Sequence, residues 1–421
     1  MRRRVWRSLL VAWGICLCAT AFGAAKPVQV KVQVNPGPWQ RLNTPVCFDL
    51  ALPKDLAALP AEALYVRLSP LGKPNSPLPV QIERPALPAG QTPANAVRLW
   101  WIAPDLAPSK PQTFEVAVRR AGPKDPPPGT SFRWQDQPGD HLDLLFGDRP
   151  VLRYMYAWDP QRYEETLKPF HHLFSPDGTR LITKGAGGMD THHRGLFIGW
   201  FDCRYDGKSA NVWRMDDKSW QEHKRFLLQE AGPVFARCRA LIHWNNPQGE
   251  PVVVEEREVT VFRQPLPTML IGFVSELRSA QGEVTLDGPK ENAKHFAGFH
   301  FRAHNDVADK YSKETRYLHP LPGLLPPSRA DPAWSAQSFS LGDARFTVGL
   351  FNHPSDPSPT EFSERPYGRF GVFFRYTLKP DETLKLQYRL FVQEGDPPPS
   401  EETINSRYVD FVNPPEVRVA R

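Results

Sequence analysis

Alternating hydrophobic and polar residues predict short β-strands throughout the first part of the chain. Valines occupy every second position from Val28 to Val34, and polar residues separate them. This period of two places the valines on one face of a half-buried strand. Further strands are predicted over residues 47–52, 64–68, 80–82, 96–102 and 113–118. Strands at such short intervals are typical of a small immunoglobulin-like β-sandwich, which we expect over residues 26–121.

A proline-rich segment, residues 122–130, separates this region from the rest of the chain and is predicted to be an extended linker. Beyond it the same patterning continues, and we interpret residues 157–184 as a loop. Strands are predicted over 142–146, 151–156, 196–198, 235–244, 252–262, 269–277, 283–287, 295–302, 346–351, 370–378 and 384–392. We expect hairpins between 142–146 and 151–156 and between 370–378 and 384–392. A helix is predicted over 400–412, with Ser400 as its N-cap.

Strands do not alternate with helices along the chain, which disfavours a parallel α/β fold. The 46 prolines among 421 residues agree with many short strands joined by proline-rich loops. The predicted fold class is therefore all-β. An immunoglobulin-like β-sandwich is followed by a large antiparallel β-sandwich over residues 131–421, curved enough to carry a cleft.

The first 25 residues have the order of a secretory signal peptide, with arginines first, then an apolar run, then small residues. We expect an exported protein, periplasmic or extracellular, with no integral membrane span. Removal of this segment takes away four arginines and no acidic residue, so the formal net charge falls from +6 to +2. No basic stripe remains, so nucleic acid is not expected as a partner. Cys47, Cys203 and Cys238 remain, and we interpret them as buried thiols.

The richest concentration of chemical groups lies in the stretch from Gly185 to Trp200. It holds flexible glycines, then Asp190, His192, His193 and Arg194, and then the apolar run 196–198. The polar group thus stands at a junction between a loop and a buried strand, which suits a binding or catalytic site. A histidine with a pKa near neutrality can act as a general acid or base. Arg194 could hold a carboxylate, such as that of an acidic sugar, or could pair with Asp190 and lock the loop.

Three sequence blocks resemble an uncharacterised bacterial family known as the PmoA-like, or methane oxygenase PmoA, family. They are residues 190–197, then 287–291 with 298–302, and then 352–354 with 359–360 and 367–368. The resemblance implies a fold similar to the mutarotase-like β-supersandwich, which is common among carbohydrate-active enzymes. An oxygenase of the membrane does not fit a chain without a predicted membrane span.

The patterning and the resemblance together give two sets of candidate residues. The candidate catalytic residues are His192, His193, Glu291 and His353, the last at the end of a strand. The candidate substrate-binding residues are Asp190, Arg194, Lys290, Tyr367 and Trp200. Tryptophans at strand positions are more often core residues than sugar platforms.

No cofactor is expected, but a divalent metal is the alternative. His192, His193, His300, His304 and His353 could supply imidazoles, with Asp190 or Glu291 as a carboxylate ligand. No two histidines show a tight ligand spacing on one strand face.

We therefore predict a carbohydrate-active protein that uses His/Glu acid–base chemistry as a hydrolase, lyase or epimerase on a carbohydrate or other small-molecule substrate. One alternative is a non-catalytic glycan-binding or surface protein, and another is a metal-dependent oxidoreductase.

Overall fold

The computed structural model describes residues 27–84, 95–126, 129–291, 295–321 and 331–420. The predicted signal peptide and part of the predicted linker lie outside these ranges. Strands make up 52% and helices 9% of the structure, and the paired strands are antiparallel. The all-β prediction is therefore confirmed. None of the helices in the described ranges combines the length and apolar character needed to cross a membrane.

The N-terminal part of the chain forms two small sheets packed around one core. A four-stranded sheet has the order β27–β1–β6–β3, and a three-stranded sheet has the order β2–β5–β4. Val34, Leu99, Trp101 and Phe114 are among the side chains buried between them. The strands are β1 (Val28–Asn35), β2 (Thr44–Ala51), β3 (Leu64–Pro70), β4 (Gln81–Glu83), β5 (Ala96–Ala103) and β6 (Gln112–Arg120), with α1 (Lys54–Ala57) and the 3-10 helix η1 (Ala61–Ala63) between β2 and β3.

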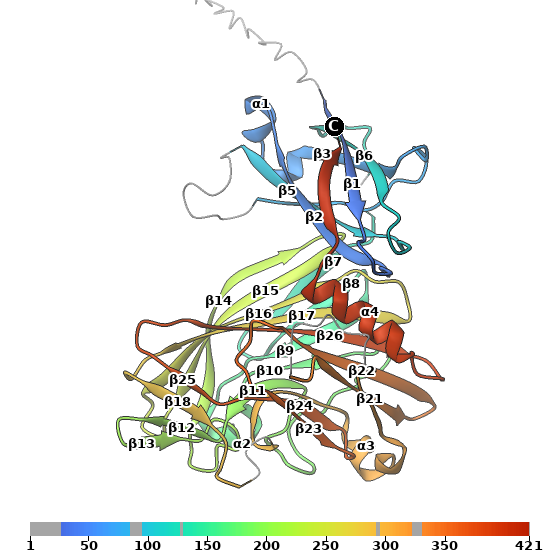
Figure 1. Cartoon of the computed structure of the whole chain (residues 1–421). Coiled ribbons are helices and arrows are strands. Elements are labelled where there is room, and N and C mark those ends of the chain that lie inside the picture. The colour runs from blue at the N-terminus through green and yellow to red at the C-terminus, as the bar shows by residue number, and fades with distance from the viewer. Residues whose placement is uncertain (1–26, 85–94, 127–128, 292–294, 322–330, 421) are drawn as a thin grey trace, which may run out of the picture.

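The C-terminal end of the chain returns to this first sandwich. After α4 (Glu401–Val412), strand β27 (Glu416–Ala420) pairs antiparallel with β1 and lies beside it in Figure 1. The sequence-based boundaries placed residues 416–420 in the second domain, and the pairing corrects that placement. The physical reason is that β1 offers an open edge, and unpaired backbone groups at an edge favour the addition of a strand.

The larger part of the chain is built on two eight-stranded sheets. The first large sheet has the order β23–β24–β19–β11–β10–β9–β8–β7. Its strands are β7 (Phe132–Gln137), β8 (His141–Phe146), β9 (Arg149–Met155), β10 (Phe170–Leu173), β11 (Leu196–Trp200), β19 (Ala297–Arg302), β23 (Glu361–Arg365) and β24 (Arg369–Phe373). The short helices beside it are η2 (Pro160–Arg162), α2 (Tyr163–Thr166), α3 (Asn305–Asp309) and η4 (Ser312–Glu314).

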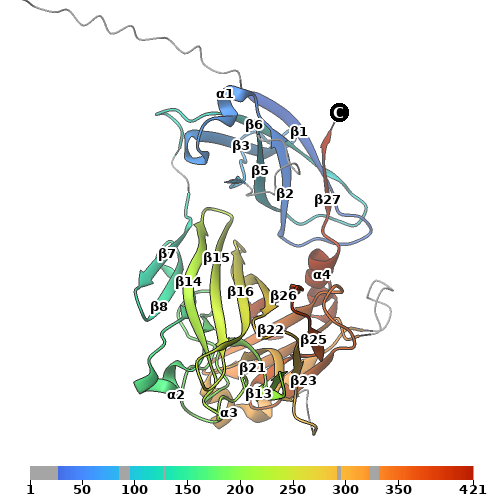
Figure 2. The same ribbon diagram turned by 90° about the vertical axis from the view of Figure 1, so that its left-hand side faces the viewer.

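The second large sheet has the order β14–β15–β16–β17–β26–β22–β21–β20. Its strands are β14 (Trp220–Ala231), β15 (Phe235–Asn245), β16 (Pro251–Phe262), β17 (Thr268–Ser279), β20 (Arg316–Leu318), β21 (Trp334–Leu341), β22 (Ala344–Asn352) and β26 (Leu384–Glu394). A small four-stranded sheet with the order β13–β12–β18–β25 contains β12 (Asp202–Tyr205), β13 (Lys208–Ala210), β18 (Val284–Asp287) and β25 (Tyr376–Leu378). Figure 2 shows these sheets below the first sandwich.

One continuous hydrophobic core joins the two large sheets. Ile198 and Phe299 from the first large sheet are fully buried with Phe273 and Leu390 from the second. The rings of Phe273 and Phe299 lie 4.2 Å apart across this interface. Because each sheet has an apolar face, packing face to face removes both from water.

Several details of the predicted strand pattern are corrected by the structure. Residues 157–184, interpreted as a loop, contain β10, which is buried in the first large sheet. The predicted hairpin between 370–378 and 384–392 does not form: β24 and β25 lie in different sheets, and β26 pairs with β17 and β22. Buried Phe374 separates β24 from β25 and packs on Trp200, which turns the chain between the sheets. The three cysteines are free; Cys203 and Cys238 are buried, and Cys47 is half-buried.

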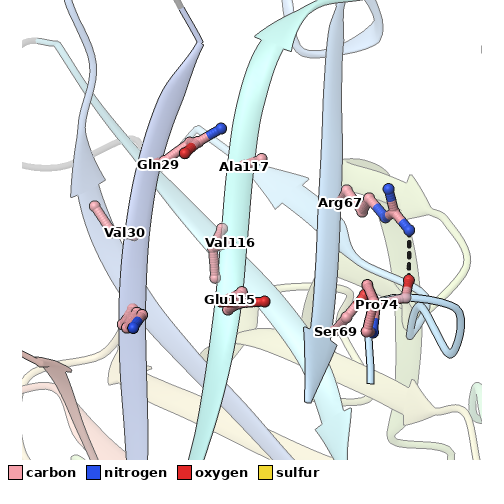
Figure 3. Close-up of a pocket in the computed structure, with 9 residues that line it drawn as sticks. Gln29, Val30, Arg67, Ser69, Pro74, Glu115, Val116 and Ala117 are labelled. Atoms are coloured by element: carbon pink, nitrogen blue, oxygen red, sulfur yellow. Dashed lines mark hydrogen bonds between the residues drawn. The ribbon is translucent and has the colours of Figure 1, made fainter. Parts of the chain in front are cut away.

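A hollow of about 430 Å³ lies on the first sandwich between β1, β3 and β6 (Figure 3). Lys31, Arg67 and Glu115 contribute its charges, and the Arg67 side chain donates a hydrogen bond to the carbonyl of Pro74. Its lining residues include no histidine or cysteine. The candidate histidines of the sequence therefore lie outside this hollow, in the larger sandwich.

Candidate functional site

The candidate loop connects β10 to β11 and depends on glycine where backbones approach closely. Gly195 has a φ of +42°, and a Cβ at this position would lie 2.1 Å from the carbonyl oxygen of His171. Any other residue would push β11 away from β10. Gly188 has a φ of +64°, and a Cβ there would meet the side chain of Asn305 at 2.6 Å. The glycines thus bring the loop down onto the end of the sheet.

A lysine beneath the loop holds its two ends together. The Lys184 Nζ donates hydrogen bonds to the carbonyls of Gly185 at 3.1 Å, Asp190 at 3.2 Å and His193 at 3.1 Å. Burial, and then the charge of Arg302, lower the pKa of Lys184 to about 7. The side chain is therefore part of the loop's internal structure rather than a surface charge.

Arg194 anchors the loop to the neighbouring helix and is not free to bind a substrate. Its guanidinium donates to the carbonyls of Thr191 at 2.9 Å and Glu165 at 2.6 Å, and also to that of Glu164. The side chain is fully buried. Neither predicted role, a carboxylate clamp or a partner of Asp190, is found in the structure. Backbone carbonyls take the guanidinium because α2 passes directly beside the loop.

Asp190, His192 and His193 form a compact cluster at the top of the loop. The Oδ2 atom of Asp190 lies 3.3 Å from Nδ1 of His193, and the two imidazole centroids are 4.1 Å apart. His193 is 3% exposed. Both of its ring nitrogens, and Nε2 of His192, are buried without a hydrogen-bond partner among the described residues. Buried polar atoms without partners are rare, so each calls for a ligand, an ion or a water molecule.

Electrostatics keep these imidazoles neutral. Burial, and then the charge of Arg369, hold the pKa of His193 well below its ordinary value. Burial and the neighbouring His193 also lower the pKa of His192. Neutral imidazoles have a free lone pair, so they can accept a proton or bind a metal.

A cavity of about 270 Å³ opens onto this cluster. Tyr367, one of the predicted site residues, lies beside it, with its ring 6.4 Å from that of His193 and nearly parallel to it. The arginines of this cavity were not among the residues predicted from the sequence. The lining residues are Asp190, His192, His193, Arg214, His295, Phe296, Arg365, Tyr367 and Arg369.

Arg369, which lines the cavity, is held in place by the buried side chain of His300. The Arg369 Nη1 donates to Nδ1 of His300 at 3.1 Å, and its Nε donates to the hydroxyl of Tyr367 at 3.0 Å. The other nitrogen of His300, Nε2, donates to the carbonyl of Ala297 at 2.9 Å. Both nitrogens of His300 are therefore used, so it positions Arg369 and is not available as a metal ligand.

The other predicted site residues lie away from this cluster. Glu291 and Lys290 are exposed and do not line the cavity. His353, at the end of β22, has its Nδ1 2.7 Å from Oγ of Ser355, and its ring contacts Phe411 of α4. Trp200 is fully buried in the core, where its Nε1 donates to the carbonyl of Phe374 at 3.1 Å. It offers no face to a sugar, which corrects its predicted binding role.

The cluster also fits part of a metal site. Asp190, His192 and His193 each offer one possible ligand atom, and these three atoms lie within 4.8 Å of one another. Among the described residues, this is the one group of three or more side chains that could hold a metal ion. Two imidazoles and a carboxylate suit several transition metals. However, the positive charge of Arg369, which disfavours a protonated His193, disfavours a metal cation in the same way. His304 caps α3 and, like His300, does not join the group.

A second cavity of about 460 Å³ lies on the other side of the loop. Gly185 and Thr191 of the loop line it, together with Glu165, Lys168 and His172. The Lys168 Nζ donates to the carbonyl of Trp213 at 2.6 Å. The Nδ1 of His172 lies 3.0 Å from the hydroxyl of Thr183. Because these groups have partners, the cavity with the unpartnered imidazoles is the stronger candidate site.

The fold and the cavity define an all-β protein with a histidine-lined site at one end of a large antiparallel sandwich. Residues 141–408 match the model of the "Family of unknown function (DUF6807)", and the chain belongs to this family. The matched range runs from β8 to α4 and includes the cavity. The family description names no methane oxygenase. No curated protein matches the chain.

Two solved structures show a distant likeness to the chain. A protein in the glycosyl hydrolase family 38 from Enterococcus faecalis is 10% identical, with a TM-score of 0.41, over 93% of this chain and 47% of that one. The chain thus spans about half the length of that protein. The GalM/aldose epimerase homologue from C. elegans is 8% identical, with a TM-score of 0.24, over 63% of this chain and 99% of that one. At these TM-scores neither likeness carries an argument about function.

Proposed function

We propose that this protein is an exported carbohydrate-active enzyme that works as a lyase or epimerase by acid–base chemistry in the cavity beside His193. The observation that carries the proposal is the buried imidazole of His193, which lines the cavity and whose Nε2 has no partner among the described residues. A general base needs a free lone pair within reach of the proton it removes. Asp190, 3.3 Å from Nδ1, can orient the ring and stabilise the imidazolium once it forms.

The acidic groups at the cavity favour a lyase or epimerase over a hydrolase. Glycoside hydrolases of the common kind use two carboxylates on opposite sides of the bond that breaks. Among the described residues that line the cavity, Asp190 is the one acidic side chain, and Glu291 lies outside it. The His/Glu chemistry predicted from the sequence is therefore replaced in the proposal by His193 as base and the Tyr367 hydroxyl as acid.

The carbohydrate class is supported by the polar lining of the cavity and by the half-buried ring of Tyr367, which a sugar could contact. The arrangement of two large sheets agrees with the supersandwich that the sequence resemblance implied. That agreement is an analogy of fold. Export is proposed from the order of residues 1–25, and the first sandwich would then be a spacer or docking module.

The test is turnover by the chain from residue 26 onwards on a panel of neutral and acidic saccharides. Elimination would give an unsaturated product that absorbs in the ultraviolet, and epimerisation in D₂O would place deuterium on the sugar. We expect His193→Gln to lose at least ~100-fold in kcat, whereas His243→Gln, on β15 of the other large sheet, should match the wild type. Equal turnover by His193→Gln and the wild type would overturn the proposal.

The Asp190–His192–His193 group supports a second candidate, a metal-dependent oxidoreductase. Metal analysis of the purified protein distinguishes the two. Stoichiometric copper or iron that is lost on His192→Gln, together with activity abolished by a chelator, would favour the metal enzyme. Sugar binding without any turnover would instead favour a glycan-binding protein.

A further inference from the structure

Three arginines lie side by side across three neighbouring strands, and two of them, Arg365 and Arg369, line the candidate cavity. Arg365 at the end of β23 is paired directly with Arg369 at the start of β24. Arg369 is in turn paired directly with Arg302 at the end of β19. Side chains directly opposite each other on antiparallel strands share one face and stand about 5 Å apart at Cβ. We call these three residues the arginine row.

The described carboxylates do not make direct ion pairs with the arginine row, and the charges of Asp190 and Asp309 act on Arg302 only from a greater distance. None of its members forms an ion pair with another described residue. The Arg302 Nη1 donates to the carbonyls of Ala303 at 3.0 Å and Tyr367 at 2.6 Å, but its Nε and Nη2 are buried without partners. The Arg365 guanidinium has no hydrogen-bond partner among the described residues, and that of Arg369 hydrogen-bonds to the neutral groups of His300 and Tyr367.

Such an arrangement costs stability unless an anion binds to it. Like charges directly opposite in a sheet are destabilising, and burial makes the cost larger. Arg302 and Arg369 are fully buried, and burial lowers the pKa of Arg302 to about 10. Arg214, 47% exposed and only loosely paired with Asp216, adds a fourth positive charge to the cavity rim.

We propose that the arginine row, through Arg365 and Arg369 at the cavity, binds the carboxylate of an acidic sugar, so that the substrate is a uronate-containing saccharide. This inference rests on the function proposed above and names its substrate class. Guanidinium groups are planar and bind a carboxylate through two parallel hydrogen bonds, which fixes its orientation as well as its position. The row stands beside the imidazole of His193, because Arg369 and His193 line the same cavity.

A carboxylate held there explains how the cavity could remove a carbon-bound proton. His193 takes the proton from the carbon next to the carboxylate, and the electron pair left on that carbon spreads into the neutralised carboxylate. In an epimerase a water molecule on the opposite face gives that carbon a proton, and the hydroxide that remains takes the proton from His193. In a lyase the electron pair forms a double bond to the next carbon, and the carbon–oxygen bond at that carbon breaks. The departing oxygen takes the proton of the Tyr367 hydroxyl. Water then returns a proton to Tyr367.

The test is direct binding, by calorimetry, of glucuronate, galacturonate and their short oligomers to the chain from residue 26 onwards, compared with the matching neutral sugars. Arg365→Gln removes a half-buried guanidinium that has no partner to lose. We expect this variant to bind the acidic sugars at least ~10-fold more weakly, because a charged hydrogen bond is lost. Arg133→Gln, in exposed β7 at the far edge of the same sheet, should bind as the wild type does.

The outcomes separate this inference from the proposed function. Acidic sugars that bind through Arg365 without turnover would support the arginine row and contradict the proposed enzyme. Turnover of neutral sugars that depends on His193 but not on Arg365 would support the proposed enzyme and contradict the arginine row as a carboxylate site. Failure of every acidic sugar to bind, or binding of a sulfated sugar alone, would overturn the carboxylate assignment.

Discussion

The Nδ1 atom of buried His193 lies 3.3 Å from the Oδ2 atom of Asp190, whose side chain is 38% exposed. The pair therefore consists of a buried imidazole and a partly exposed carboxylate. In an acid–base mechanism the carboxylate orients the ring and stabilises its protonated form. Lys184, which bonds to the carbonyls of both Asp190 and His193, fixes their separation.

Asp190→Asn should lower kcat by ~10- to 1000-fold while the fold is retained, because an amide does not stabilise an imidazolium as a carboxylate does. Steady-state kinetics on a substrate found in the saccharide panel would measure this. Asp148→Asn, a fully exposed turn residue, is the matched control. An unchanged kcat in Asp190→Asn would show that the pair is structural.

Acidification should destabilise the protein between pH 6.5 and about pH 4. Burial lowers the pKa of His172 and of His223 to about 4, below the ordinary value of 6.5. The unfolded chain therefore binds more protons than the folded chain in this window, and the free energy of unfolding falls as the pH falls. For His172 alone the full shift corresponds to ~3 kcal/mol.

Urea unfolding at several pH values from 7 to 4 would measure this loss, and His172→Gln should reduce its slope. His319, whose pKa is raised by its hydrogen bond to Glu364, has the opposite sign, but its side chain is 57% exposed and its effect small. A free energy of unfolding that stays constant across the window would contradict the burial of these imidazoles.

Lys184→Met should loosen the candidate loop more than it destabilises the whole protein. The substitution keeps the apolar stem but removes the donor to three carbonyls, each bond contributing ~1 kcal/mol. We expect faster amide hydrogen exchange over residues 185–193 and reduced turnover. Lys310 is an exposed lysine that follows α3, and Lys310→Met should leave both the amide exchange and the turnover unchanged. Unaltered exchange in Lys184→Met would show that the glycines and Arg194 suffice to hold the loop.

Asp410→Ala should destabilise the connection between α4 and the first sandwich. The Asp410 carboxylate accepts hydrogen bonds from Nη1 of Arg41 at 3.0 Å and from the Thr44 hydroxyl at 2.6 Å, and it is 2% exposed. Loss of one partner of a buried ion pair costs ~3–5 kcal/mol. Asp49→Ala removes an exposed pair with Arg98 and should cost at most ~1 kcal/mol. Equal effects of the two substitutions on thermal unfolding would contradict this contrast.

The strands that sequence patterning identified best are those with one face in a core. The valines of β1 alternate with polar residues because one face of that strand is solvated. This period of two predicted the strand from the sequence. In contrast, the four residues of β10 are all buried, and two of them are histidines. No alternation or apolar run marks such a strand, so the sequence was interpreted as a loop.

The stretch that holds the candidate cluster could be predicted from the sequence, but the partners that surround the cluster could not. Asp190, His192 and His193 are neighbours in the chain, so their clustering followed from local sequence alone. Arg369 and Arg302 join the site through strand register, which no local pattern encodes. The sequence held one signal that could have indicated the arginines. Arg365 and Arg369 flank a tight turn, which places them opposite each other in the hairpin of β23 and β24.

By itself the sequence determined the all-β class, the concentration of polar groups before β11 and the N-capped helix near the C-terminus, because these depend on residues close together in the chain. Only the tertiary structure decided that Arg194 would bind carbonyls of α2, that Trp200 would enter the core, and that β27 would return to β1. These outcomes depend on which distant segments meet. A side chain's role follows from whether its new neighbours satisfy its charge and hydrogen bonds, as they do for Arg194 and do not for His193.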